Sequence, residues 1–313
     1  MKIKNLVFKC KCNKVYALFF LILTITLSLV SCKKNEKESK LNQVSKVKYV
    51  NPFIGTAGHG HTYPGATVPF GMLQVSPDNG ISKWDWCSGY HYSDSITIGF
   101  SHLHLSGTGI GDLADVRLMP INKKVDLTKE VKSRDDIPYK STYSHLNETA
   151  KPGYYSVDLK DFNIKTELTS SLRAANHKYT FDKEDIQSVI IDLGFAINWD
   201  KTLISNIKIV DSTTISGYRH SKGWANNQKV FFVAKFSKPI TEYTLVKDGL
   251  KIEESSVVGE KTYAQLFFDE KKGIDLQVKV SLSSVSIDNA IENLSTSRND
   301  FNFDSVKNEA EAN

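Results

Sequence analysis

Side chains that could do chemistry gather in three short clusters, all before residue 120. The clusters span residues 51–66, 84–92 and 99–112, and they hold five of the chain's eight histidines and two of its four tryptophans. Aromatic rings offer flat apolar faces to a pyranose, while imidazole, carboxylate and amide groups hydrogen-bond its hydroxyls. Glycines, frequent in all three clusters, let the backbone approach closely and adopt positive φ. This combination favours the binding of a sugar.

A structural interpretation of the same residues stays open. Trp84 and Trp86 would share one face of an extended segment, so that face must be buried and both rings could be core aromatics. The histidines could equally be packing groups whose hydrogen bonds are satisfied within the loops. Their concentration in one region favours a functional role for the group rather than for each member.

Histidine spacing raises a metal-dependent alternative. Two pairs are spaced i, i+2, which puts both imidazoles of a pair on one side of an extended strand. The pairs, with the carboxylates that could complete a zinc site, are His59/His61 and His102/His104 with Asp112 or Asp115. The His-Gly-His sequence lacks the downstream Asp-His that is typical of metal-dependent hydrolases of the β-lactamase type. A zinc-dependent hydrolase therefore ranks below sugar binding.

Other chemistries find little support. Gly107, Gly109 and Gly111 are spaced G-x-G-x-G with no surrounding βαβ unit, which argues against a dinucleotide loop. Ser88 and Ser106 lack the context of a nucleophile elbow, and no two carboxylates form an evident acid–base pair. The formal charge of +5 equals the five lysines that precede residue 15. The rest of the chain is therefore neutral and gives no electrostatic case for binding nucleic acid.

The N-terminal segment has the pattern of an export signal. Those lysines precede an apolar run over residues 15–30, and Leu29-Val30-Ser31-Cys32 matches a bacterial lipobox. We expect residues 1–31 to be a lipoprotein signal peptide, Cys32 to be lipidated, and residues 32–47 to form a flexible tether. This predicts a lipoprotein of the bacterial cell envelope that is anchored in the outer membrane and faces the periplasm or the cell surface. An uncleaved membrane anchor is the alternative.

The elements that must position the three clusters are strands. Period-2 alternation of apolar and polar residues marks strands with one buried face, and turn residues separate successive runs. The predicted strands cover residues 154–159, 162–168, 175–181, 188–193, 207–210, 213–218, 230–236, 241–246, 262–268 and 276–282. The pattern predicts an all-β fold, a large antiparallel β-sandwich. Residues 49–120 look like loops packed on that scaffold.

Helix-forming residues appear near the end of the chain. Residues 288–295 and 304–312 are predicted to be helical, with Asp304 as a candidate N-cap. The helical signal continues up to Asn313 without a Gly or Pro stop, and a helix this short would be marginal alone. We therefore expect residues 288–313 to be the start of a helical linker to a further domain.

Several unusual blocks, in order, resemble the opening of glycoside hydrolase family 92. The blocks are residues 49–56, 58–66, 69–72, 84–92 and 99–112, with shorter echoes at 152–155, 167–169, 223–225 and 283–286. The resemblance implies an N-terminal β-sandwich, supersandwich-like, over residues 48–287. It also implies a helical linker and a C-terminal (α/α)6 barrel after it.

The resemblance implies a calcium-dependent, inverting exo-α-mannosidase that acts on α-mannosides of N-glycans or mannan. In the family, the catalytic carboxylates and most calcium ligands come from the C-terminal barrel, so no catalytic or metal residue is assigned in this chain, which we expect to be inactive alone. The sandwich contributes loops to the mannose pocket. By motif match, the residues expected to line that pocket are His59, His61, Trp84, Asp85, Trp86, Tyr90, His91, His102 and His104.

Three of these residues, Trp84, Trp86 and His91, are the preferred sugar contacts. The expected partners are α-mannoside glycans, the C-terminal (α/α)6 domain and a membrane reached through the lipid anchor. A stand-alone glycan-binding surface lipoprotein is the alternative function, and the zinc-dependent hydrolase ranks third.

Overall fold

A computed structural model of the chain describes residues 46–80, 83–182, 186–269, 274–298 and 300–313. The chain divides into two units, residues 1–48 and 49–313. Of the first unit only the start of the 3₁₀ helix η2 (Lys46–Tyr49) is described, so the predicted signal peptide, Cys32 and most of the tether lie outside the described residues. Within the part that is described, no helix is long and apolar enough to cross a membrane.

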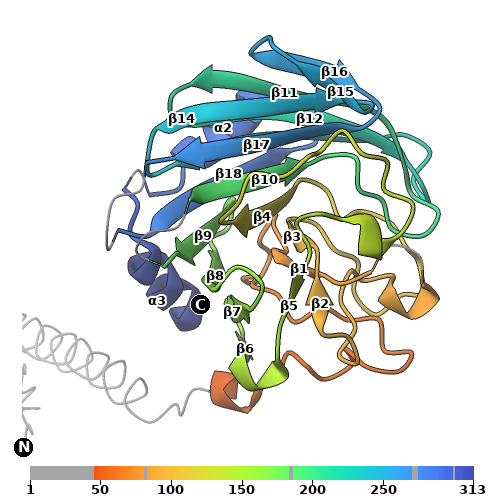
Figure 1. The fold of residues 1–313 in the computed structure, drawn as a ribbon. Helices are drawn as coiled ribbons and strands as arrows, with labels where there is room; N and C mark the ends of the chain where they lie inside the picture. The colour runs from red at the N-terminus through yellow and green to blue at the C-terminus, as the bar shows by residue number, and fades with distance from the viewer. Residues whose placement is uncertain (1–45, 81–82, 183–185, 270–273, 299) are drawn as a thin grey trace, which may run out of the picture. The chain divides into compact units, whose positions relative to one another are not determined.

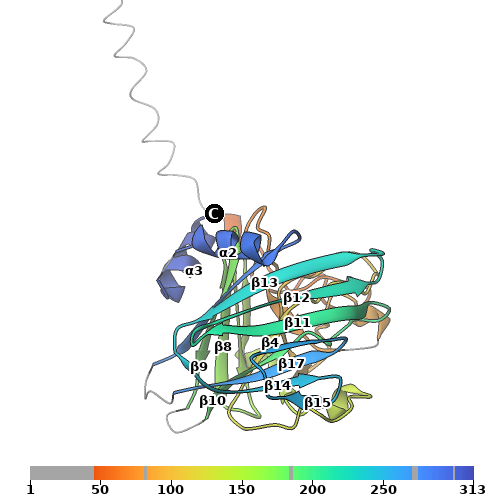
Figure 2. The ribbon, with the colours of Figure 1, turned by 90° about the horizontal axis from the view of Figure 1, so that it is seen from above.

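Two large antiparallel sheets stack face to face in residues 49–313 (Figures 1 and 2). As far as the structure describes the chain, one sheet has nine strands, in the order β16 (Ser256–Gly259), β11 (Lys201–Asp211), β12 (Thr214–Lys222), β13 (Gln228–Phe236), β18 (Leu276–Ser283), β9 (Ala174–Thr180), β8 (Ile164–Ser170), β7 (Tyr154–Leu159) and β6 (Glu148–Lys151). The other has seven, in the order β1 (Ser76–Asp78), β3 (Gly99–Ser101), β4 (Arg117–Ile121), β10 (Gln187–Asp192), β17 (Thr262–Phe268), β14 (Ile240–Lys247) and β15 (Leu250–Ile252). A small sheet pairs β2 (Ile96–Thr97) with β5 (Ser141–Thr142). Short 3₁₀ helices lie at η3 (Trp84–Trp86), η4 (Arg134–Asp136) and η5 (His145–Asn147).

The hydrophobic core fills the space between the two large sheets. Because side chains alternate along a strand, each strand sends one set of residues inward. Aligned core residues are Leu118, Ile191, Ala264 and Leu245 on the seven-stranded sheet, and Ala234, Val280 and Ala175 on the nine-stranded sheet. All belong to one buried cluster, so the two sheets form a single sandwich.

The predicted all-β antiparallel sandwich is confirmed. Strands β7 and β17 coincide with the predicted runs, residues 154–159 and 262–268. Strand β11 begins six residues before the predicted run at 207, because its first half exposes the apolar Leu203 and Ile204 and buries polar residues, so it lacks the expected alternation. Strands β15 and β16 were not predicted, since each is short and mostly exposed or half-buried.

Residues 49–120 are not loops alone. Strands β1, β3 and β4 of this region form one end of the seven-stranded sheet. Strand β4 is buried at all five positions, so it shows no alternation, and β1 and β3 are three residues each. The prediction of loops packed on a scaffold missed these strands because each lacks a period-2 signal.

Two helices cover the outer face of the nine-stranded sheet. Helix α2 (Ile287–Ser295) packs on β18 and β13, and α3 (Phe303–Ala312) packs on β7, β8 and β9 (Figure 2). The predicted N-cap of α3 at Asp304 is wrong. The side chain of Asn302 caps the helix by accepting a hydrogen bond from Ser305 N at 3.0 Å. The helix begins at Phe303, one residue earlier than predicted, and the side chain of Phe303 is buried.

Candidate functional site

Residues 84–86 place the two predicted tryptophans in different environments. They form the 3₁₀ helix η3 rather than an extended strand, so the expected shared face does not form. Trp84 remains 49% exposed and donates its indole N–H to the carbonyl of Gly109 at 3.0 Å. Trp86 is turned inward and donates its indole N–H to Asp94 Oδ2 at 2.9 Å. Of these two residues, Trp84 is therefore the one with the more exposed ring.

A cluster of two histidines and a carboxylate surrounds the Trp84 ring. His59 Nδ1 lies 2.6 Å from Asp85 Oδ1, and His61 Nε2 lies 3.4 Å from the same oxygen. The centroids of the two imidazoles are 5.3 and 4.4 Å from that of Trp84. The hydrogen bond from His59 holds the pKa of the Asp85 carboxyl below its usual value, so this group stays ionised. We call His59, His61, Trp84 and Asp85 the Trp84 cluster.

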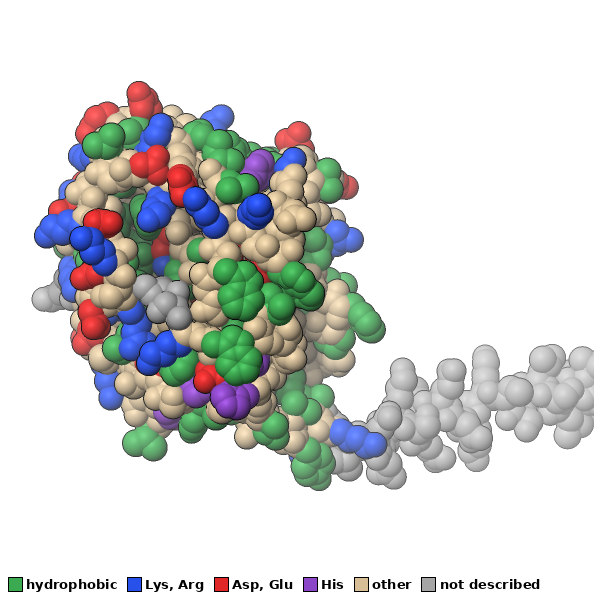
Figure 3. All heavy atoms as spheres, turned by 90° about the vertical axis from the view of Figure 1, so that its right-hand side faces the viewer, with side chains coloured by type: hydrophobic (Ala, Val, Ile, Leu, Met, Phe, Trp, Pro, Cys, Tyr) green, Lys and Arg blue, Asp and Glu red, His purple; other side chains and the backbone are tan. Residues whose placement is uncertain are grey.

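The geometry of the Trp84 cluster suits a sugar. It combines a flat ring with imidazole and carboxylate groups that can bond hydroxyls at fixed angles. Figure 3 faces the side of residues 49–313 on which these loops lie, and large hydrophobic side chains there adjoin histidine and acidic side chains. His61 is buried whereas His59 is exposed, so the cluster runs from the surface inward.

The Trp84 cluster is also the one group of potential metal ligands found within the described residues. One ligand atom each from His59, His61 and Asp85 lies within 4.8 Å of the others. Calcium takes about six to eight oxygen ligands, and only one of these three donors is an oxygen, so the set does not fit calcium. Two imidazoles and a carboxylate are instead typical of zinc-type ions.

The zinc site expected from the sequence would use Asp112 or Asp115, and this choice of carboxylate is wrong. Asp112 accepts hydrogen bonds from the backbone N–H groups of Leu113, Trp224 and Ala225. Asp115 is fully buried and pairs with Arg219 at 2.7 Å. Neither carboxylate approaches the histidine pairs, and Asp85, which lies 26 residues after His59, takes that place.

A second layer of polar contacts holds η3 and its neighbours in place. The His91 ring stacks on Trp86 with centroids 4.3 Å apart, and its Nε2 lies 3.2 Å from the carbonyl of Gly58. Arg134 forms an ion pair with Asp94, the carboxylate that accepts from Trp86. Trp86 and His91 therefore support the loop that carries His59 and are less exposed than Trp84.

Tyr90 and His104 are buried as well. The Tyr90 hydroxyl donates to Glu148 at 3.1 Å and its ring is fully buried. His104 Nε2 lies 3.2 Å from Asp78 Oδ1, and both side chains are inaccessible. Gly89 has φ +87°, and a Cβ there would lie 2.6 Å from Asp78 Oδ1 and 2.9 Å from the His104 ring. A larger residue at position 89 would thus push this layer apart.

His102 lies in the core between the sheets, away from the Trp84 cluster. Its Nδ1 donates to the carbonyl of Val116 at 2.5 Å, and its Nε2 lies 2.9 Å from Nε2 of His177 on β9. Tyr179 donates its hydroxyl to His177 Nδ1 at 2.8 Å. Because His102 Nδ1 must donate, its Nε2 accepts from His177 Nε2. With both rings neutral, all four ring nitrogens then have a hydrogen-bond partner. Burial lowers the pKa of His102 to about 4 and that of His177 well below its usual value.

Two exposed tryptophans near the Trp84 cluster were not among the predicted site residues. Trp199 is 52% and Trp224 is 64% exposed. The loop of residues 109–112 connects them to Trp84: Gly109 accepts from the Trp84 indole, Gly111 packs against Asn198, and Asp112 holds the backbone N–H of Trp224 at 2.8 Å. Trp199 lies in no recognised motif and Trp224 lies only in the short family echo at 223–225, so only the fold could bring both rings to this loop.

Backbone strain accompanies this loop. Leu113, Ala114 and Val116 have φ values of +69°, +58° and +57°, a left-handed conformation that costs non-glycine residues of order 1–3 kcal/mol each. The loop is held by the hydrogen bonds of Asp112 and by the pairing of His104 with Leu113. Such strain is typical of functional loops whose surroundings fix them.

One known protein family matches most of this chain. Residues 49–283 match the glycosyl hydrolase family 92 N-terminal domain. The chain belongs to glycosyl hydrolase family 92. This match covers both sheets of the sandwich and all the predicted site residues.

Solved structures of family 92 enzymes share its fold. A family 92 α-mannosidase from Bacteroides thetaiotaomicron, also known in complex with mannoimidazole, is 36% identical with a TM-score of 0.80, and the match covers 85% of this chain and 37% of that chain. A family 92 inverting mannosidase from the same organism is 27% identical with a TM-score of 0.72, over 85% of this chain and 35% of that chain.

A fungal relative is matched over a shorter stretch. An uncharacterized secreted glycosidase of Arthroderma benhamiae is 30% identical over 155 residues, which are 47% of this chain and 20% of that protein. This family 92 chain thus spans little more than a third of the two bacterial enzymes and a fifth of the fungal protein.

Proposed function

We propose that this family 92 chain forms the sandwich-side wall of the mannose pocket of a calcium-dependent, inverting exo-α-mannosidase that acts on N-glycan or mannan α-mannosides. The observation that carries the proposal is the exposed face of Trp84, fixed by Gly109 and flanked by His59, His61 and Asp85. The α-mannosidase activity of its structural relatives supports the substrate class.

Catalysis needs groups that the described residues do not bring to Trp84. An inverting glycosidase uses a carboxylic acid and a carboxylate base about 6.5–9.5 Å apart. Asp85 is the carboxylate beside Trp84, and two histidines already engage it. The Trp84 cluster also does not fit calcium. We propose that a C-terminal (α/α)6 domain supplies the acid, the base and the calcium ligands.

Nuclear magnetic resonance of the indole N–H groups tests the sugar-facing role. Methyl α-mannoside should shift the Trp84 indole signal, assigned with Trp84→Phe, and leave that of Trp86, whose N–H is donated inward to Asp94, unchanged. The purified chain should release no mannose from an α-mannobiose, with or without calcium. A Trp84 signal that ignores the sugar would refute the wall proposal, and measurable mannose release would refute the external origin of the catalytic groups.

A stand-alone glycan-binding lipoprotein is the second candidate. The three exposed rings of Trp84, Trp199 and Trp224 favour it, because such rings can bind glycans without catalysis. Binding of α-mannosides in the millimolar range or tighter by the purified chain would support this candidate, and weaker binding would support the wall of a larger site.

A zinc-dependent hydrolase is the third candidate, favoured by the proximity of His59, His61 and Asp85. We propose that these residues bind sugar rather than metal, because the imidazoles pack on an aromatic ring and His59 is largely exposed. Total metal analysis of the purified protein should find no stoichiometric zinc, and hydrolysis abolished by a chelator would overturn this ranking.

Attachment to the cell envelope is part of the proposal. The lipobox ending at Cys32 supports a lipid anchor, and two or more acyl chains hold a protein firmly on a membrane. Cys32→Ala should move the protein from the membrane fraction to the soluble fraction. An unchanged distribution would contradict the anchor.

A further inference from the structure

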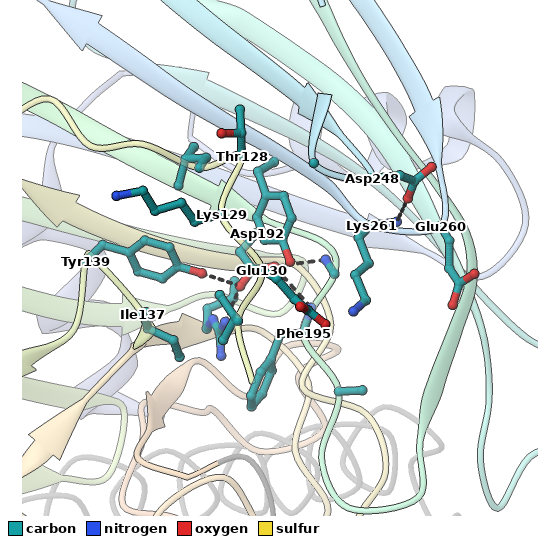
Figure 4. A pocket seen from close by; sticks show the side chains of 17 residues that line it. Thr128, Lys129, Glu130, Ile137, Tyr139, Asp192, Phe195, Asp248, Glu260 and Lys261 are labelled. Carbon is teal, nitrogen blue, oxygen red and sulfur yellow. Dashed lines mark hydrogen bonds and ion pairs between the residues drawn. The ribbon is translucent and has the colours of Figure 1, made fainter. Parts of the chain in front are cut away.

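A cavity lies on the outer face of the seven-stranded sheet, beneath the segment that joins β4 to β5 (Figure 4). Its volume is about 710 Å³, within the ~300–1,000 Å³ range of small-ligand pockets. Arg117, Asp192 and Tyr263 form its floor, aligned across β4, β10 and β17. Their neighbours along each strand belong to the core, so alternation points this row to the opposite face.

The floor of the cavity holds a buried ion pair with unequal hydrogen bonding. Both oxygens of Asp192 are fully engaged: Oδ1 accepts from Gly194 N at 2.8 Å and Phe195 N at 3.0 Å, and Oδ2 accepts from the Tyr139 hydroxyl at 2.8 Å and from Arg117. Arg117 is 2% exposed, yet its Nε and Nη1 have no hydrogen-bond partner within the described residues. A buried donor without a partner is costly, so the floor has spare capacity for an acceptor.

At the rim of the cavity, too, the acidic groups have partners while a cationic group lacks an ion pair within the described part of the chain. Its acidic residues are engaged, Glu130 with Lys132, Glu260 with Lys201, and Asp248 with the backbone N–H of Lys261. The ammonium group of Lys261 has no ion pair with any residue the structure describes. Figure 4 shows the Lys261 side chain extending into the mouth of the cavity, on the side opposite Tyr139. Spare cationic donors therefore exist at both floor and rim.

The walls add flat apolar surface. The Phe195 ring lies under the Arg117 guanidinium, 3.6 Å from ring centroid to Cζ, and Tyr139 and Tyr263 also line the space. Guanidinium and ammonium groups bind carboxylates and phosphates, while aromatic rings pack on the C–H faces of sugar rings. We propose that this cavity binds an anionic monosaccharide, a uronate or a sugar phosphate, whose charged group is held by Arg117 and Lys261.

This site does not depend on the mannoside role of the Trp84 cluster, so a calorimetric titration can separate the two. The purified chain is titrated with glucuronate, mannose 6-phosphate, inorganic phosphate and neutral methyl α-mannoside. We expect saturable binding of at least one anionic sugar, and the arm that binds identifies carboxylate or phosphate. Lys261→Gln should weaken that binding about tenfold, the effect of losing one charge-assisted hydrogen bond.

Two control variants make the result specific. Lys208→Gln removes an exposed lysine of β11, in the other sheet, and should leave the affinity unchanged. Trp84→Ala removes the proposed mannoside site and should leave the Lys261-dependent binding of the anionic sugar in place, because the Trp84 cluster shares no lining residue with this cavity. Thermal melting of each variant verifies folding, which is why the rim lysine is preferred to the buried Arg117.

Four outcomes would overturn the proposal. They are no saturable binding of either anionic sugar, an unchanged affinity in Lys261→Gln, equal affinity of Trp84→Ala for the neutral mannoside and the anionic sugar, and inorganic phosphate binding as tightly as the sugar phosphate. The last would show that the sugar ring contributes nothing and that the aromatic walls play no part.

Discussion

Two pairs of histidines with the same spacing end in opposite environments. His59 and His61 lie beside Trp84 and share the carboxylate of Asp85. His102, by contrast, is buried between the sheets against His177, and His104 is held in a neighbouring buried layer by Asp78. In the surface cluster both imidazoles share one carboxylate and His59 is open to solvent. Both core histidines are buried, His102 against a carbonyl and another imidazole, and His104 against Ser101, the Gln74 carbonyl and Asp78. The comparison teaches that the neighbours across the fold, rather than the spacing, decide whether a histidine recognises a ligand or supports the sandwich.

The strongest test of this contrast is the removal of His102, which breaks the buried contact between His102 and His177. His102→Ala should lower the free energy of unfolding by about 2–4 kcal/mol, since it opens a cavity and leaves His177 Nε2 and the Val116 carbonyl without partners. Chemical denaturation measures the change. The mannoside-induced shift of the Trp84 indole should persist in the folded variant, and its loss would place His102 in the binding site.

Acid should lower the stability that His102 and His177 contribute. Both rings have a lowered pKa in the folded state, His102 to about 4, and an unfolded histidine titrates near 6.5. Their stabilising effect is complete above pH 6.5 and is lost as the pH falls towards 4, by about 1.4 kcal/mol per pH unit for each ring.

A variant without the two buried histidines isolates their effect from that of a buried carboxylate. Burial raises the pKa of Asp200 to about 6, so that group lowers stability as pH rises from about 4 to 6 and opposes the histidines. The double variant His102→Gln/His177→Asn keeps Asp200 but lacks the histidine contribution. Its unfolding free energy should fall less than that of the natural chain between pH 6.5 and 4, and parallel pH profiles would refute the neutral pair.

Removal of Trp84 should change sugar binding more than stability, the reverse of the effect of His102→Ala. Trp84→Ala should weaken methyl α-mannoside binding by at least about tenfold, because the ring supplies the main apolar contact. Since Trp84 is half exposed, the melting temperature should change far less than in His102→Ala. Binding can be followed through the remaining indole signals of Trp199 and Trp224, and unchanged affinity would remove Trp84 from the site.

The smallest expected effect belongs to His59. Its side chain is 75% exposed, so His59→Ala should change the free energy of unfolding by less than about 0.5 kcal/mol. Mannoside affinity should fall a few-fold through the loss of one hydroxyl partner. A destabilisation as large as that of His102→Ala would erase the distinction between the two pairs.

Much of the sandwich could be predicted because its strands have one buried face. Alternation in residues 154–159 and 262–268 marks strands that the structure reproduces. Strand β4 is buried at every position and gives no such signal, and the cap of α3 depends on how Phe303 packs. Those features follow from tertiary contacts that no local pattern contains.

The candidate site could be predicted in part. The density of aromatic, histidine and glycine residues indicates a sugar-facing region, and the family match includes it. The partner of His59 is Asp85, 26 residues away. Trp199 and Trp224 lie in the connections before β11 and after β12, and contacts of their segments with Gly111 and Asp112 bring them to the loop of residues 109–112. The cavity above Arg117 and Asp192, which lie 75 residues apart, likewise exists only once β4 and β10 pair.

The hydrogen bond between the Trp84 indole and Gly109 has an entropic consequence. A free tryptophan loses rotamer freedom when a ligand orders it, at a cost of ~0.5–1.5 kcal/mol. Here the carbonyl of Gly109 fixes the ring during folding, and Asp112 fixes the loop that carries this carbonyl. The sandwich has therefore met that cost before any glycan arrives, and the sugar encounters a surface already in its binding conformation.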